Sequence, residues 1–103
     1  MTAFGIERVA EGRLQASGSL DFDTAAAALE RGLRLLASEN ICEIDLSGVA
    51  SSDSAGLAVL VEWLAYAQAS GKGLQFTGLP GQIRAVAAIS EVDELLVEGV
   101  GPR

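Results

Sequence analysis

Alternating hydrophobic and polar residues predict two short strands at the start of the chain. The first runs from Phe4 to Val9 and the second from Arg13 to Ser17, where Leu14 and Ala16 share one face. The Ala10–Gly12 segment between them contains a glycine, as tight turns between strands commonly do. The chain is therefore expected to open with a β-hairpin.

A helix is predicted next, from Asp21 to Leu36, because apolar residues recur there at helical spacing. Asp21, Asp23 and Thr24 are all suitable N-cap residues, and the two carboxylates suit the positive end of the helix dipole. The face that this helix is expected to bury consists of five residues: Phe22, Ala26, Leu29, Leu33 and Leu36.

The rest of the pattern alternates between strand and helix. Ile41–Leu46 is predicted as a strand, and its alternating polar residues indicate that one face is only partly covered. Ser47–Asp53 is predicted as a loop, and Ser54–Gln68 as a helix that Gly71 ends. Four further segments are expected to form, in order, a strand, a helix, a short apolar run and a frayed tail: Leu74–Thr77, Pro80–Ile89, Leu95–Val97 and Gly99–Arg103.

The predicted order is thus β-β-α-β-α-β-α with a possible short terminal strand. Such an order favours an α/β fold in which helices pack on a small mixed β-sheet whose later strands are parallel. The chain has 103 residues, of which 50% are hydrophobic. This is enough for one core and too little for two, so residues 1–103 are expected to form a single domain.

The net charge of the chain argues against several classes of binding partner. Acidic residues number 14 and basic residues 7, which gives a net charge of -7. A domain with this field repels polyphosphate and anionic lipid headgroups, so neither a nucleic acid nor an anionic membrane surface is an expected partner.

Composition also limits catalysis. The chain has no histidine, which excludes Ser-His-Asp and Cys-His catalysis and histidine metal sites. Asp45 and Asp53 have no third ligand near them in the sequence, so no metal site is expected. No Gly-Lys-Ser/Thr loop for a nucleotide is present either. We therefore expect no cofactor and no enzymatic activity.

Targeting signals are not seen. Met1–Ala10 has no apolar core of a signal peptide, and the single cysteine, Cys42, cannot form an internal disulfide. The longest apolar stretch, Leu57–Ala67, is interrupted by Glu62 and is too short to span a bilayer. A cytoplasmic protein without direct membrane insertion is expected.

The junction between the third strand and the second helix carries the most information. Asp53 and Ser54 stand where a helix begins, and a helix N-terminus favours an anion or a phosphoryl group. Ser54 would present its hydroxyl there, and Asp53 could orient it. The same residues are also ordinary helix caps, and Gly56 could simply permit close packing. The residues alone leave both interpretations open.

One side of the second helix carries two aromatic residues at neighbouring positions. Trp63 and Tyr66 lie there with Val59, away from the stripe expected to face the core. Aromatic residues of this kind are enriched as anchors at protein interfaces. They also cover the edges of hydrophobic cores, so both possibilities remain.

Three segments resemble the STAS domains, the family of anti-sigma-factor antagonists and sulfate-transporter C-terminal domains. The run Ile44–Leu60 reads IDLSGVASSDSAGLAVL, and it includes the DSAG motif. The segments Ser17–Asp21 and Gly78–Ala87 follow the family's order and spacing. The resemblance implies a STAS fold with helices on one face of the sheet, and it places Ser54 at the family's phosphorylatable or functionally sensitive position.

Within this family, the run Glu62–Pro80 is most similar to the stand-alone STAS subunit of Mla phospholipid transporters. That resemblance implies a non-catalytic subunit that binds the cytoplasmic ATPase of an inner-membrane ABC complex and helps to maintain outer-membrane lipid asymmetry. The protein would then lie at the inner membrane through its partner. The alternative is an anti-sigma-factor antagonist that an anti-sigma kinase phosphorylates on Ser54.

A contact surface is expected at the first half of the second helix, the loop before it and its aromatic side, and the third helix could extend this surface. Seven residues make up this expected surface: Asp53, Ser54, Ala55, Gly56, Val59, Trp63 and Tyr66. A small hydrolase or nucleotide-binding enzyme is the third possibility, and the missing histidines and nucleotide loop argue against it.

Overall fold

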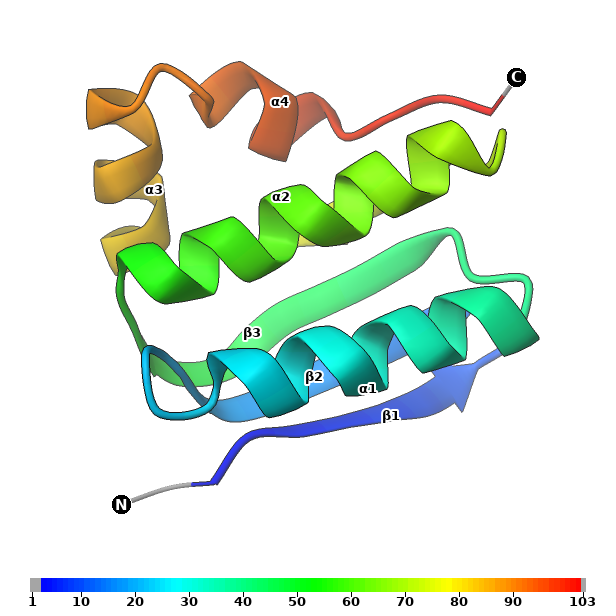
Figure 1. Ribbon diagram of the computed structural model, residues 1–103, viewed down its shortest axis with the longest axis horizontal. Helices are drawn as coiled ribbons and strands as arrows, with labels where there is room; N and C mark the ends of the chain where they lie inside the picture. Colours follow the sequence, from blue (N-terminus) through cyan, green and yellow to red (C-terminus); the bar gives the residue numbers. More distant parts are fainter. Residues whose placement is uncertain (1–2, 103) are drawn as a thin grey trace.

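The computed structural model describes residues 3–102, which form a four-stranded mixed sheet and four helices (Figure 1). The sheet has the order β1-β2-β3-β4, in which β1 and β2 are antiparallel and the other pairs are parallel. In chain order the elements are β1 Gly5–Ala10, β2 Arg13–Leu20, α1 Ala25–Ser38, β3 Glu43–Ser52, α2 Ser54–Ala69, β4 Gln75–Thr77, α3 Gly81–Ile89 and α4 Asp93–Glu98. The predicted α/β fold with a mixed sheet is confirmed.

Helices α1 and α2 lie side by side on one face of the sheet and begin at the same end of the molecule (Figure 1). The sheet buries the apolar residues of its strands against them, including Leu14, Ile44 and Phe76. Helix α3 stands at the end where α2 begins, and α4 follows it alongside α2 (Figure 1). The start of α2 is therefore surrounded by segments that are far apart in the sequence.

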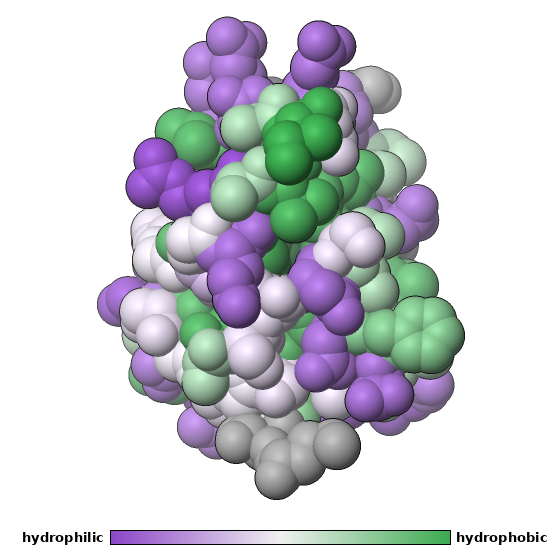
Figure 2. Space-filling view, turned by 90° about the vertical axis from the view of Figure 1, so that its left-hand side faces the viewer, coloured by the Kyte–Doolittle hydropathy of each residue, from purple (hydrophilic) through white to green (hydrophobic). Residues whose placement is uncertain are grey.

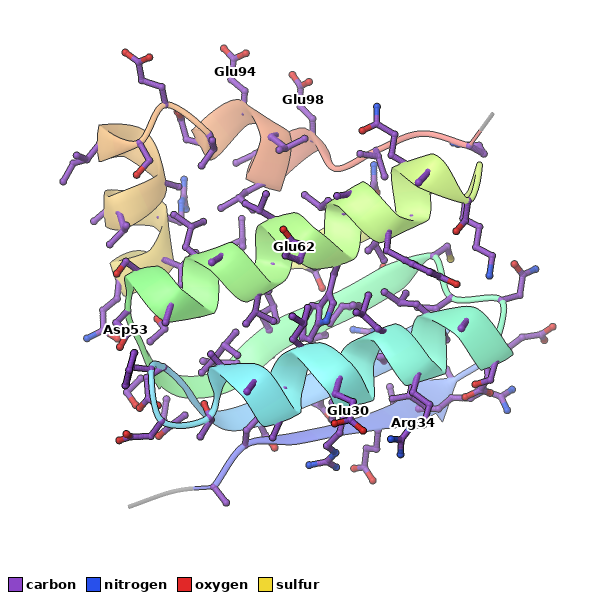
Figure 3. All side chains as sticks on the ribbon, in the orientation of Figure 1. Glu30, Arg34, Asp53, Glu62, Glu94 and Glu98 are labelled. Carbon is purple, nitrogen blue, oxygen red and sulfur yellow. The ribbon has the colours of Figure 1, made fainter. Side chains whose placement is uncertain are left out.

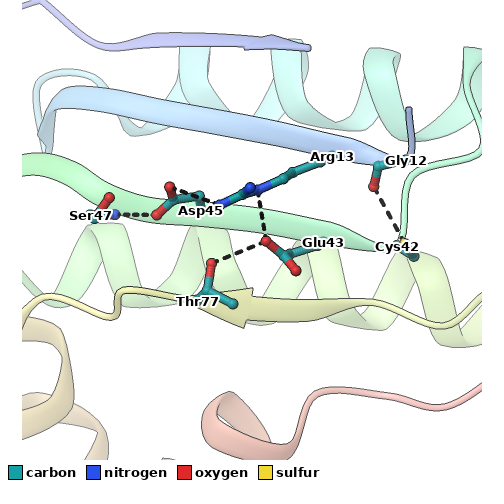
Figure 4. Close-up of polar contacts among 7 residues, drawn as sticks. All are labelled: Gly12, Arg13, Cys42, Glu43, Asp45, Ser47 and Thr77. Atoms are coloured by element: carbon teal, nitrogen blue, oxygen red, sulfur yellow. Dashed lines mark hydrogen bonds and ion pairs between the residues drawn. The ribbon is translucent and has the colours of Figure 1, made fainter. Parts of the chain in front are cut away.

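The opposite face of the sheet is polar (Figure 4). Arg13 lies there between two carboxylates, with its Nε 2.8 Å from Glu43 Oε2 and its Nη2 3.4 Å from Asp45 Oδ2. The backbone N–H of Ser47 donates to Asp45 Oδ1 at 2.9 Å, which lowers the pKa of Asp45, and Arg13 lowers it further. This confirms that one face of the third strand is only partly covered.

Trp63 occupies the centre of the core and has no exposed surface. Its ring centroid lies 6.5 Å from those of Phe4 and Phe76, and its indole N–H donates to the Leu29 carbonyl at 3.4 Å. A Cβ at Gly32 of α1 would lie 2.3 Å from this ring. The glycine therefore allows α1 to pack directly on the tryptophan, which explains the glycine within that helix.

The third strand is longer than predicted, because Ser47–Ser52 continues it instead of forming a loop. These small residues, three of them serines, have no alternating pattern, yet they pair in parallel with the end of β2 as far as the Leu20–Ser52 pair. Gly48 permits the close approach, since a Cβ there would lie 2.9 Å from the Ala16 carbonyl oxygen. Backbone pairing with β2 makes this segment a strand, and Val49 and Ser52 are the side chains that it buries.

The first helix begins later than predicted, at Ala25. Asp21 and Thr24 organise the turn before it: Asp21 Oδ1 accepts from the backbone N–H of Asp23 at 3.0 Å, and the Thr24 hydroxyl donates to the Ser19 carbonyl at 2.9 Å. Phe22 lies in this turn and is 82% exposed, so its placement on the buried face was wrong. The residues that α1 does bury are Ala28, Gly32 and Leu36.

The C-terminal apolar run forms α4 rather than a short strand. Asp93 and Glu94 in its first turn suit the positive end of a helix, and Leu96 is its buried residue. Val100 follows it and pairs with Leu74 through a backbone N–H to O bond of 2.8 Å, so the predicted frayed tail is held at this position. The predicted glycine end of the second helix is found at Gly71, whose φ is 72°.

Candidate docking site at the start of α2

Asp53 is the N-cap of α2 and joins two segments of the chain. Its Oδ1 accepts from the backbone N–H groups of Ala55 and Gly56, at 2.9 and 3.2 Å. Its Oδ2 accepts from the backbone N–H of Phe22 at 3.1 Å. The carboxylate thus satisfies two donors that the helix leaves unpaired and also holds the turn before α1 against the start of α2.

Ser54 is the first residue of α2 rather than its cap, which corrects the capping role considered for its hydroxyl. The side chain is exposed and makes no hydrogen bond within residues 3–102. The cap role belongs to Asp53, because a carboxylate oxygen reaches two N–H groups from that position. The Ser54 hydroxyl is therefore available to a partner or a modifying enzyme.

Gly56 has a packing role. A Cβ at this position would lie 2.2 Å from the carbonyl oxygen of Leu20, which is the last residue of β2. Only a glycine lets the first turn of α2 approach the sheet so closely. Gly56 is therefore buried below the surface that Ser54 occupies.

An apolar groove of about 460 Å³ runs between the first turns of α1 and α2. Alanines make up half of its eight lining residues, and Val59 also lines it. Phe22 stands at its edge, and Glu62 is the one charged residue among its lining residues. Figure 3 shows Asp53 at the start of α2 and Glu62 farther along the same helix. The lining residues are Phe22, Ala25, Ala26, Leu29, Ala55, Ala58, Val59 and Glu62.

The structure brings only some of the expected surface residues together. Ser54 and Ala55 lie at the groove or beside it, whereas Trp63 lies in the core and cannot contact a partner. Tyr66 is half-buried against the core, about one turn beyond Glu62, the last residue of α2 that lines the groove. The aromatic side of α2 is thus a core contact at Trp63, which the glycine at position 32 makes possible.

Sequence reasoning missed Phe22 as a surface residue. Its spacing agrees with the buried face of α1, but it precedes the first residue of that helix. The signal that could have placed it is the group of cap-forming residues around it, because Asp21, Asp23 and Thr24 favour a turn over a helical start.

No cluster of three or more potential metal ligands is present among the residues that the structure describes. Asp45 and Asp53 stand on β3 and just beyond its end, separated by roughly 25 Å of extended strand. An apolar groove beside a capped helix start has the shape and character that an apolar segment of another protein can occupy.

Solved structures with the same fold include anti-sigma factor antagonists. A Thermotoga maritima protein that is provisionally assigned as an anti-sigma factor antagonist matches with a TM-score of 0.73 and 19% identity, over 91% of this chain and 83% of that chain. The unphosphorylated anti-sigma factor antagonist SpoIIAA matches with a TM-score of 0.64 and 14% identity, over 84% of this chain and 83% of that chain. The architecture is therefore a STAS-like α/β fold.

The family itself follows from the sequence. The family model described as "Mlab, STAS domain" matches residues 6–98, so the chain belongs to the STAS domain family. No curated protein sequence is significantly similar to it. In the part of the chain that the structure describes, no helix has both the length and the apolar character needed to cross a bilayer.

Proposed function

We propose that this chain is a non-catalytic STAS subunit that binds the cytoplasmic ATPase of an Mla-type phospholipid ABC transporter. It supports the assembly or activity of that transporter in maintaining outer-membrane lipid asymmetry. The protein would lie at the cytoplasmic side of the inner membrane through this partner. The observation that carries the proposal is the match of residues 6–98 to the Mlab, STAS domain model.

The groove between α1 and α2 is the proposed contact surface. Phe22 exposes a large apolar side chain beside it, and Ser54 presents a hydroxyl at the start of α2. Small residues along both helices leave room for a helix of the partner to lie in the groove. Asp53 ties the two sides of this surface together, so the groove exists before the partner binds.

The second candidate is an anti-sigma-factor antagonist that a kinase regulates through Ser54. The exposed hydroxyl at the start of α2 favours it, because a phosphate there would lie near the positive end of the helix. Under this proposal the partner is an anti-sigma kinase rather than a transporter ATPase.

Co-expression with each partner separates the two functions. The chain would be produced with the Mla-type ATPase of its own host and, separately, with an anti-sigma kinase of that host. Stable co-purification with the ATPase and an unchanged mass of the chain are expected. Phosphorylation of Ser54 by the kinase, without ATPase binding, would establish the alternative instead.

Variants of the surface then test the contact. Phe22→Ser is expected to weaken ATPase binding by roughly 2 kcal/mol, about thirtyfold, as removal of an interface anchor commonly does. Ser54→Glu should fold as the wild type does yet bind poorly, because a buried and unpaired carboxylate is costly, and Ser54→Ala should be milder. Val9→Ser removes an exposed apolar residue from β1 and serves as the matched control. Equal effects of Phe22→Ser and Val9→Ser would remove the groove from the interface.

A further inference from the structure

A second apolar surface lies on α3 and α4. The residues that the structure describes include five large apolar side chains with substantial exposure, and three of them lie here. Ile89, the last residue of α3, is 84% exposed. Val97 on α4 is 58% exposed, and Leu95 lies on the same helix as Val97. Figure 2 looks onto the end of the molecule that carries α3, and hydrophobic side chains gather in its upper part.

A hollow of about 170 Å³ accompanies these side chains. Ala87 and Ala88 of α3 and Leu96 and Val97 of α4 give it apolar walls. This hollow is separate from the α1–α2 groove and shares no lining residue with it. The exposed apolar residues and the hollow together offer a surface for an apolar side chain of a partner.

Acidic residues surround this surface. Glu91, Asp93, Glu94 and Glu98 are all exposed, and none of them takes part in an ion pair within residues 3–102. Figure 3 shows Glu94 and Glu98 standing out from α4 into solvent. Arg84 is the basic residue at the hollow. The surface therefore attracts cations around an apolar centre.

This arrangement of carboxylates destabilises α4 in the isolated protein. Glu94 and Glu98 lie four residues apart on one helix, where like charges repel each other. Glu98 also ends α4, where a carboxylate faces the negative end of the helix dipole. Cationic groups of a partner would relieve both repulsions.

We infer that the α3–α4 surface binds a basic amphipathic segment of a protein partner, at a site distinct from the α1–α2 groove. Its apolar residues would contact Ile89 and Val97, and its lysine or arginine side chains would pair with the surrounding carboxylates. Charge argues against the other occupants. A second copy of this chain, with a net charge of -7, would meet repulsion, and so would an anionic membrane.

A synthetic helical peptide of leucine and lysine is the probe for this surface. It would be titrated into the isotope-labelled protein and followed by NMR. Shifts confined to residues 79–98 are expected, and binding should weaken as salt is added. Two control peptides carry glutamate in place of lysine or serine in place of leucine, and neither should bind comparably.

Matched variants separate a specific site from general attraction to an acidic protein. Glu94→Gln with Glu98→Gln should weaken peptide binding about tenfold, whereas Glu7→Gln with Glu11→Gln removes the same charge elsewhere and should leave it nearly unchanged. Ile89→Ser should weaken binding about tenfold, while Phe22→Ser should not. Equal losses in both charge variants, shifts spread over the whole surface, or no binding of the leucine–lysine peptide would overturn the inference. These outcomes are independent of ATPase binding at the α1–α2 groove.

Discussion

The start of α1 and the end of α3 both expose a large apolar side chain, but their surroundings differ. Phe22 stands beside a groove that is lined mainly by apolar residues and carries one charged residue, Glu62. Ile89 stands beside a six-residue helix, α4, with carboxylates around it. Binding at the first surface should therefore depend little on salt, and binding at the second should depend on it strongly.

The two surfaces also differ in how the fold supports them. The α1–α2 pair rests on Trp63, which packs against Gly32, and on Gly56, which packs against the Leu20 backbone. Helix α4 buries one side chain, that of Leu96, and the backbone pair between Val100 and Leu74 holds the chain just after it. The first surface is thus rigid and formed in advance, while the second is lightly held and more able to adjust to a partner.

The largest expected effect on stability comes from Trp63, the core residue on which the α1–α2 surface rests. Trp63→Ala should lower the free energy of unfolding by about 3–5 kcal/mol, because it leaves a cavity between α1 and the sheet. Tyr66→Ala, at a half-buried neighbour on the same helix, should cost clearly less. Chemical denaturation followed by circular dichroism measures both. A smaller loss for Trp63→Ala than for Tyr66→Ala would contradict the core position of the tryptophan.

The second-largest effect on stability is expected at Gly56, where α2 packs closely on the sheet. Gly56→Ala should cost about 1–3 kcal/mol, because the added methyl group meets a backbone oxygen that cannot move away easily. Gly81→Ala is the matched control at the first residue of α3, where a Cβ has no neighbour within 4 Å. It should be neutral or slightly stabilising, since alanine favours helix. Similar melting temperatures of the two variants would show that α2 can shift without cost.

Sequence patterns predicted the helices better than the surfaces that they make. Asp53 and Ser54 mark the start of α2 correctly, because a cap followed by apolar residues is a local signal. The half of β3 beyond Leu46 could not be predicted, since its strand state depends on backbone pairing with β2. The burial of Trp63 depends on Gly32, which belongs to another helix. Such contacts between distant segments are not visible in a local pattern.

The resemblance to STAS domains points to the start of α2, where the proposed contact surface lies, but not to all the residues of that surface. Ser54 is exposed there as expected, whereas Phe22 reaches the same surface from the turn before α1. The pattern of α1 alone could not place it, because hydrogen bonds of the Asp21 and Thr24 side chains form a turn there and delay the start of the helix to Ala25.

The cap of α2 should contribute less to the free energy of unfolding than the packing contacts of Trp63 and Gly56 do. Asp53→Ala is expected to cost about 1 kcal/mol, because it leaves the N–H groups of Ala55 and Gly56 without their acceptor. It should also weaken ATPase binding, since the carboxylate holds Phe22 beside the groove. Asp53→Asn keeps an acceptor oxygen and should retain most of the stability. Thermal melts and affinities of the two variants check this, and equal losses would argue against a capping role.

The smallest expected effect is a gain, and it lies on the second surface. Glu91 has a φ of 61°, a left-handed conformation that costs a residue with a side chain about 1 kcal/mol relative to glycine. Glu91→Gly should therefore raise the free energy of unfolding by roughly that amount, whereas Glu94→Gly, inside α4, should lower it by about 0.5–1 kcal/mol. Both variants remove one carboxylate from the α3–α4 surface, so both should bind the leucine–lysine peptide less tightly despite their opposite effects on stability. Melting temperatures and peptide titrations on the same samples would reveal this separation. If Glu91→Gly bound the peptide as tightly as the wild type does, the carboxylate at position 91 would have no part in recognition.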